Sequence, residues 1–298
     1  MKIKHLLLHL MFQHSRNKSK KKGALIGQQC IVPRKGEKGV QTYLYRPKDP
    51  GAGELPVLFN VHGGAWIGSD ATALDSQSQM LSDRLSCFVV NVNYTKLDAK
   101  PFAYPQYELR DTVLYFRDHA KEHHIDPERF SLIGYSAGGH LCAGTAMLLR
   151  DMGFRLNSQF LCYPFLDFNR LGDLLGADGE KTAKLMDEIF FAKMEKSEPL
   201  LSPAAAPAEA LRGLAPAEII TCGDDALYAH AVSYRQLLTQ AGVSAVQKDF
   251  HGSIHGFLEV NFPETEKNGA KSPEQEALMQ QAMEYICDRA GYHWQKEN

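Results

Sequence analysis

Short runs of β-forming residues alternate with longer segments of helical periodicity from about residue 55 to the end of the chain. The strand-like runs cover residues 56–61, 87–94, 129–133, 159–163, 217–222 and 245–250. The helical segments cover residues 107–124, 137–149, 229–241 and 274–290. This alternation is typical of a mostly parallel central sheet with helices on both faces. The sequence therefore predicts an α/β fold, preceded by an antiparallel edge strand at residues 42–46.

A G-x-S-x-G pentapeptide, Gly134-Tyr135-Ser136-Ala137-Gly138, lies directly between the third strand-like run and a helical segment. This context is that of a nucleophile elbow, in which a serine lies on a strained strand-to-helix turn. Small residues are needed at the two glycine positions, because side chains there would meet the neighbouring strand and helix. The start of the helix also points free N–H groups at the place where negative charge develops. We therefore expect Ser136 to be a nucleophile.

A second glycine motif, His62-Gly63-Gly64-Ala65-Trp66, follows the first strand-like run. Consecutive glycines let the backbone approach a ligand closely and turn its N–H groups inward. The N–H groups of Gly63 and Gly64, together with that of Ala137, are expected to bind a tetrahedral oxyanion. An ordinary glycine-rich turn is the alternative interpretation. Substrate-pocket positions are expected at Ala65, Trp66 and Tyr135.

An acid and a base are available after the last two strand-like runs. The acid is Asp224 or Asp225, and the base is His251 or His255, which agrees with the order serine, acid, histidine of hydrolases with a serine elbow. A catalytic histidine needs a loop that brings it back over the elbow. This requirement favours His255, between Ile254 and Gly256, over His251, which ends a strand.

One long segment interrupts the alternation. Residues 167–207 stand where a short strand-to-helix link is expected, and loops of that length are usually functional or disordered. The segment contains a helical patch with apolar side chains such as Met186 and Phe191, followed by a proline-rich stretch. We therefore expect a packed insertion that acts as a lid over the active site.

The first 22 residues differ in charge from the rest of the chain. They hold seven lysine and arginine residues and no acid, whereas the whole chain has a net charge of −2, so the remainder carries −9. That acidic remainder offers no basic face to a nucleic acid, and the apolar run at residues 6–12 is too short to span a bilayer. Three interpretations stay open: an amphipathic helix packed on the body, a weak contact with a membrane surface, or an unstructured start. The first is favoured.

Together these motifs resemble the hormone-sensitive-lipase-like esterase family of α/β-hydrolases. The matching pieces are residues 62–66, 93–94, 101–102, 126–129, 134–140, 225–227 and 255–257. The resemblance implies an α/β-hydrolase domain at residues 40–298 with a cap insertion at about 167–207, and a cap-like segment at residues 1–39. It further implies a catalytic triad and an oxyanion hole with these members: Ser136, Asp225, His255, Gly63, Gly64 and Ala137.

Two positions depart from the family pattern. Ala65 stands in place of the third glycine of H-G-G-G, and Ala226 in place of the proline of D-P-L. The resulting H-G-G-x-W motif is similar to that of arylformamidases and of some acetyl- and feruloyl-type esterases. The departures therefore leave the substrate open, while the mechanism stays the same.

The expected activity is hydrolysis of short-chain, acetyl-like esters through an acyl-enzyme on Ser136. A formamide or amide hydrolase with the same triad is the alternative among enzymes; a non-catalytic ligand-binding relative is disfavoured because all three triad residues are present. No metal and no cofactor is implied. The expected partner is a small-molecule ester, without nucleic acid or stable membrane insertion, and a homodimer stays open. Six scattered cysteines, none in a C-x-x-C pair, fit reduced thiols and a cytoplasmic location.

Overall fold

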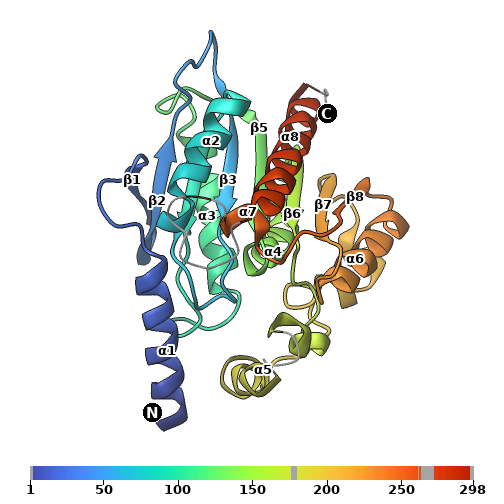
Figure 1. Ribbon diagram of the computed structural model, residues 1–298. Helices are drawn as coiled ribbons and strands as arrows, with labels where there is room; N and C mark the ends of the chain where they lie inside the picture. Colours follow the sequence, from blue (N-terminus) through green and yellow to red (C-terminus); the bar gives the residue numbers. More distant parts are fainter. Residues whose placement is uncertain (1–2, 176–179, 261, 263–271, 296–298) are drawn as a thin grey trace.

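A single eight-stranded sheet forms the centre of the computed structural model, which describes residues 3–175, 180–260, 262 and 272–295. The strands are β1 (Gln28–Arg34), β2 (Glu37–Tyr45), β3 (Leu55–Val61), β4 (Phe88–Asn93), β5 (Ile125–Tyr135), β6 (Ser158–Cys162), β7 (Ala217–Cys222) and β8 (Ala245–Phe250). Their order across the sheet is β1-β2-β4-β3-β5-β6-β7-β8 (Figure 1). Neighbouring strands from β4 to β8 are parallel to one another. The β1–β2 and β2–β4 pairs are antiparallel.

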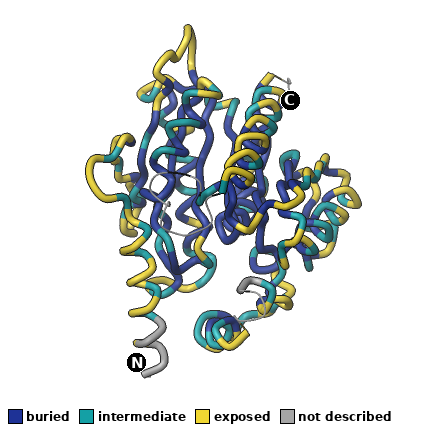
Figure 2. The backbone as a smooth tube through the Cα atoms, viewed as in Figure 1, coloured by how far each residue is buried: buried dark blue, intermediate teal, exposed yellow. Residues whose placement is uncertain are grey.

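Helices cover both faces of the sheet (Figure 1). Helices α3 (Tyr104–Asp118), α4 (Ala137–Asp151) and α6 (Tyr228–Gln240) pack on one face, and α2 (Asp75–Leu85), α7 (Phe257–Val260) and α8 (Pro273–Gln295) pack on the other. Strands β3, β6 and β7 are buried along their whole length, and Figure 2 shows the buried centre of the sheet. Burial on both faces explains why these strands are continuous apolar runs in the sequence. The predicted α/β fold is confirmed.

The edge of the sheet differs from the prediction. The antiparallel strand expected at residues 42–46 is present as β2, but it pairs with β4 on one side and with β1 on the other. It is therefore not an edge strand, because β1 occupies the edge. The sequence of β1 contains a proline and mostly exposed residues, so it lacks the apolar pattern of a buried strand. Because β1 belongs to the sheet, the sheet begins before the expected boundary at residue 40.

The N-terminal helix α1 (Ile3–Ser19) is attached to the body mainly by charged side chains. Arg16 donates to Asp98 at 2.7 Å and to the carbonyl of Ile67 at 2.7 Å. Phe12 packs against the core, whereas the described apolar residues Leu6, Leu10 and Met11 are exposed. The helix thus rests on the body, but its described apolar side chains do not form the main contact. In the described part of the chain, no helix combines the length and apolarity needed to cross a membrane.

The insertion predicted at residues 167–207 follows β6 and contains α5 (Glu180–Met186) between short turns of other helix types. Two of its apolar residues, Met186 and Phe191, are fully buried, so its described part is packed as expected. Figure 1 shows α1 and α5 on the same side of the molecule, beyond the end of the sheet.

Candidate active site

Ser136 lies on the turn between β5 and α4 with a backbone φ of 52° and ψ of −116°, a conformation that L-residues rarely adopt. A Cβ atom on Gly134 would lie 2.3 Å from the carbonyl oxygen of Gly138. A Cβ atom on Gly138 would lie 2.1 Å from the carbonyl oxygen of Val61. The close approach of strand and helix therefore requires glycine at both positions, which is the physical basis of the predicted elbow.

The predicted triad residues lie in hydrogen-bonding contact. The Nε2 atom of His255 is 3.0 Å from Oγ of Ser136, and its Nδ1 atom is 2.6 Å from Oδ2 of Asp225. The other carboxylate oxygen of Asp225 accepts the N–H of Leu227 at 3.0 Å, which fixes the orientation of the carboxylate. With Nδ1–H donating to Asp225, Nε2 is left to accept the serine proton, as a general base requires.

The competing acid and base residues point elsewhere. Asp224 is exposed at the surface, next to Asp225 in the chain. The side chain of His251 is 90% exposed and lies 3.6 Å from Asp249. The structure thus brings Asp225 and His255 to the serine and leaves Asp224 and His251 at the periphery.

The H-G-G loop forms a concave turn beside the elbow. Gly64, Ala65 and Trp66 follow one another with positive φ angles of 104°, 49° and 61°. Successive residues of this kind turn their N–H groups toward one side and make a nest for an anion. Among the described residues, the N–H groups of Gly64 and Ala65 have no acceptor, and Ala137 presents its N–H at the first position of α4. These N–H groups are available to a negatively charged oxygen.

Gly63 differs from the expectation that its N–H faces an oxyanion. In the structure this N–H donates to Oε1 of Glu259 at 3.0 Å. The donor is therefore already occupied, and the part of the loop that stays available begins at Gly64.

The buried Lys96 contacts the H-G-G loop through the side chain of His62. Nζ of Lys96 lies 2.8 Å from Nε2 of His62, and Nδ1 of His62 lies 2.7 Å from the carbonyl oxygen of Gly63. The carbonyl can only accept, so Nδ1 carries the proton and Nε2 accepts from Lys96. Burial lowers the pKa of His62 well below its usual value and lowers the pKa of Lys96 to about 7. His62 is thus held neutral in a defined tautomer that fixes the orientation of the Gly63 carbonyl.

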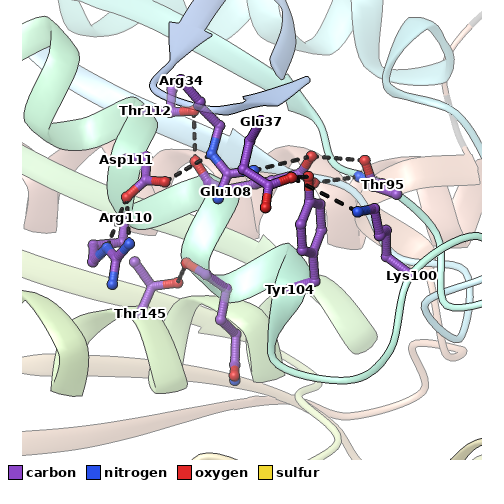
Figure 3. A network of polar contacts seen from close by, with 11 residues as sticks. Arg34, Glu37, Thr95, Lys100, Tyr104, Glu108, Arg110, Asp111, Thr112 and Thr145 are labelled. Carbon is purple, nitrogen blue, oxygen red and sulfur yellow. Dashed lines mark hydrogen bonds and ion pairs between the residues drawn. The ribbon is translucent and has the colours of Figure 1, made fainter. Parts of the chain in front are cut away.

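A polar network around the start of α3 holds the segment that carries Lys96 (Figure 3). The backbone N–H and the hydroxyl of Thr95 donate to Glu108 at 2.6 and 2.7 Å. Arg34, from β1, forms an ion pair with Asp111 at 2.7 Å. The network therefore connects the β1–β2 hairpin, α3 and the residue next to Lys96, and so supports the loop indirectly.

Trp66 links the H-G-G loop to the insertion. Its ring is 5.0 Å from that of Phe168 and 5.9 Å from that of Phe191, and its Nε1–H donates to Nδ1 of His140 at 3.1 Å. Trp66 and Tyr135 are both fully buried, whereas Ala65 is partly accessible. Contact of these three residues with a substrate stays a prediction.

Sequence reasoning did not identify Lys96 and Glu259, two charged residues that contact the loop at residues 62–63. Neither residue belongs to one of the motifs recognised in the sequence, and Glu259 lies 196 residues from Gly63. Only the folded arrangement brings these groups together.

The parallel sheet, the strained serine turn at its edge and the aligned histidine and aspartate define the class of the protein as an α/β-hydrolase. Comparison with known families agrees: the model of a family described as having the alpha/beta hydrolase fold matches residues 58–259. The chain belongs to this family, and the resemblance inferred from the motifs is confirmed.

Named relatives and solved structures are similar over most of the chain. An arylesterase of Saccharolobus solfataricus is 30% identical over 215 residues, covering 68% of this chain and 68% of that protein. The carboxylesterase NlhH of Mycobacterium tuberculosis is 30% identical over 217 residues, covering 70% and 67%. The crystal structure of a thermostable esterase from Pseudomonas putida has a TM-score of 0.80 at 22% identity, covering 98% of this chain and 91% of that one. The structural likeness supports the fold.

Proposed function

We propose that the protein is a serine carboxylesterase that hydrolyses short acyl esters by double displacement. The observation that carries the proposal is the continuous line of contacts from Ser136 through His255 to Asp225. The relatives named arylesterase and carboxylesterase support the same reaction. A formamide or amide substrate would use the same residues, and no observation favours it over an ester.

The proposed mechanism follows from the geometry. Oγ of Ser136 attacks the ester carbonyl while Nε2 of His255 takes the hydroxyl proton, and Asp225 stabilises the resulting imidazolium. The tetrahedral oxyanion is bound by the N–H groups of Gly64 and Ala137, with Ala65 in the role expected of Gly63. His255 then protonates the leaving alcohol as the acyl-enzyme forms. A water molecule that gives its proton to His255 attacks the acyl-enzyme, and the acid leaves with Ser136 restored.

We propose acetyl to about hexanoyl groups as the preferred acyl chains, because pocket walls discriminate by about 1–3 kcal/mol for each methylene. The packing of Phe168 and Phe191 on Trp66 supports this limit, since Trp66 is expected to line the pocket and both rings contact it. The six free thiols, four of them buried, support a reducing compartment such as the cytoplasm. A homodimer stays a prediction that light scattering would test.

The test is a panel of p-nitrophenyl esters from acetyl to palmitoyl, assayed beside an aryl formamide, with Ser136→Ala as the control. We expect the highest kcat/KM between acetyl and hexanoyl and little turnover of the formamide. Faster hydrolysis of palmitoyl than of butyryl ester would contradict the chain-length preference. A kcat/KM for the formamide above that of every ester would replace the esterase proposal by formamide hydrolysis.

A further inference from the structure

A partly buried glutamate lies between the two loops of the active site. Glu259 is on α7, four residues after His255, and its Oε1 accepts the N–H of Gly63 at 3.0 Å. Its other oxygen, Oε2, is 3.4 Å from the hydroxyl of Tyr163. The ring of Tyr163 is in turn 5.0 Å from that of His255. The carboxyl group thus connects the H-G-G loop to the part of the site that carries the base.

The carboxyl group of Glu259 lies close to the backbone of Gly63, where a side chain would otherwise stand. A Cβ atom at position 63 would lie 3.1 Å from each carboxyl oxygen of Glu259, and 3.1 Å from the carbonyl oxygen of Tyr135. Such distances are tighter than those of ordinary side-chain contacts, so the missing side chain leaves the space that Glu259 uses. An acid that is partly removed from water and seated this closely against the main chain needs hydrogen-bond donors, and the N–H of Gly63 is one.

Contacts on both sides fix the two peptide groups that flank Gly63. In a trans peptide the carbonyl and the N–H point in opposite directions. Tyr94 donates to the carbonyl of His62 at 3.2 Å while the N–H of Gly63 donates to Glu259, so the peptide between residues 62 and 63 is held at both ends. The carbonyl of Gly63 accepts from His62, so the N–H of Gly64 points away from the His62 ring. Rotation of either peptide would change where the N–H of Gly64 points.

We propose that Glu259 is a positioning residue of the active site: its carboxyl oxygen holds the N–H of Gly63 and thereby aims the N–H groups of Gly64 and Ala65 at the oxyanion. The inference rests on the proposed role of Ser136. Burial raises the pKa of Glu259, and a protonated carboxyl group keeps a carbonyl oxygen that can accept the same hydrogen bond. The shift favours the neutral form, which does not repel a developing oxyanion.

The test compares Glu259→Ala with Glu259→Gln, whose amide oxygen can still accept from Gly63. We expect Glu259→Ala to lower kcat on p-nitrophenyl acetate by about 100-fold with KM within about threefold, because the oxyanion exists only in the transition state. Glu259→Gln is expected to stay within about tenfold of the parent kcat, since the acceptor is kept. Where Glu259→Ala fails to fold, Glu259→Met fills a similar volume without an acceptor and carries the same expectation.

Glu218→Gln is the matched control, because Glu218 is a buried glutamate that binds Tyr285, Arg289 and His293 away from the elbow. It should lower the melting temperature and leave the kcat of the folded enzyme unchanged. A folded Glu259→Ala or Glu259→Met with kcat within twofold of the parent would overturn the inference, and so would a Glu259→Gln as impaired as Glu259→Ala. Failure of the proposed function has another signature: Ser136→Ala would keep its turnover.

Discussion

Nδ1 of His255 lies 2.6 Å from Oδ2 of Asp225, while the neighbouring Asp224 is exposed to solvent. This difference predicts opposite outcomes for two otherwise identical substitutions. Asp225→Asn should lower kcat by about 10⁴-fold, because an amide that donates to Nδ1 stabilises the wrong tautomer of His255. Asp224→Asn should change kcat by less than about threefold, since exposed substitutions away from the site have small effects. Steady-state kinetics on one ester decide between them, and the reverse ranking would assign the acid to Asp224.

The ammonium group of Lys96 gives the free energy of unfolding a pH dependence. Burial lowers its pKa from 10.5 to about 7, so between these values the unfolded chain binds more protons at this site than the folded chain. The parent protein should therefore gain stability relative to Lys96→Met as pH rises from 7 toward 10, at a slope of at most about 1.4 kcal/mol per pH unit. Urea unfolding of both proteins at pH 7 and pH 9 measures this difference.

Lys100→Met is the control for Lys96, because Lys100 lies on the same segment but is exposed beside Glu37. Its stability should follow the parent at both pH values. A Lys96→Met protein whose unfolding free energy parallels that of the parent would show that Lys96 keeps an ordinary pKa. Lys96→Met should also lower kcat by about tenfold or more, because His62 loses the donor that fixes its tautomer and the Gly63 carbonyl.

Removal of residues 1–22 tests the role of α1. The deletion would remove Arg16 from Asp98 and from the carbonyl of Ile67, which directly follows Trp66 in the H-G-G loop. If the segment belongs to a cap, KM should rise and discrimination between acetyl and hexanoyl esters should weaken, with the triad intact. Arg16→Met should give part of this effect, and Lys18→Met, on the exposed side of the helix, should give none.

The other two interpretations of the segment have different signatures. A contact with a membrane surface predicts unchanged kinetics on soluble esters and loss of binding to anionic vesicles on deletion, because residues 1–22 carry seven basic side chains. An unstructured start predicts no change in either assay. Unchanged kinetics after deletion would exclude the cap.

The features that could be predicted from the sequence are those that depend on short segments. The elbow requires glycine at positions fixed by a single strand-to-helix turn, so Ser136 is recognisable from five residues. The convergence of the acid and the base follows from the parallel sheet, because carboxyl ends of parallel strands share one edge. Sequence reasoning alone left two aspartates open; the family resemblance favoured Asp225, and the loop conformation brings it to His255.

The features that could not be predicted depend on contacts between distant segments. Glu259 follows the H-G-F motif but belongs to no motif itself, and its partner Gly63 belongs to the H-G-G loop, which is distant in the sequence. The expectation that Gly63 binds the oxyanion considered only the loop itself and omitted this competing acceptor. Strand β1 was missed because an edge strand with mostly exposed residues lacks the apolar pattern by which buried strands are recognised.

The central claim is that Ser136 is the nucleophile that carries the acyl group. The most direct measurement is mass spectrometry of the protein after reaction with a fluorophosphonate, followed by peptide mapping. We predict one phosphonyl group per chain, on the peptide that contains Ser136, together with complete loss of esterase activity. Ser136→Ala should fold, remain unlabelled and lose activity by about 10³-fold or more. Labelling at another residue, or a folded Ser136→Ala with near-normal turnover, would contradict the assignment.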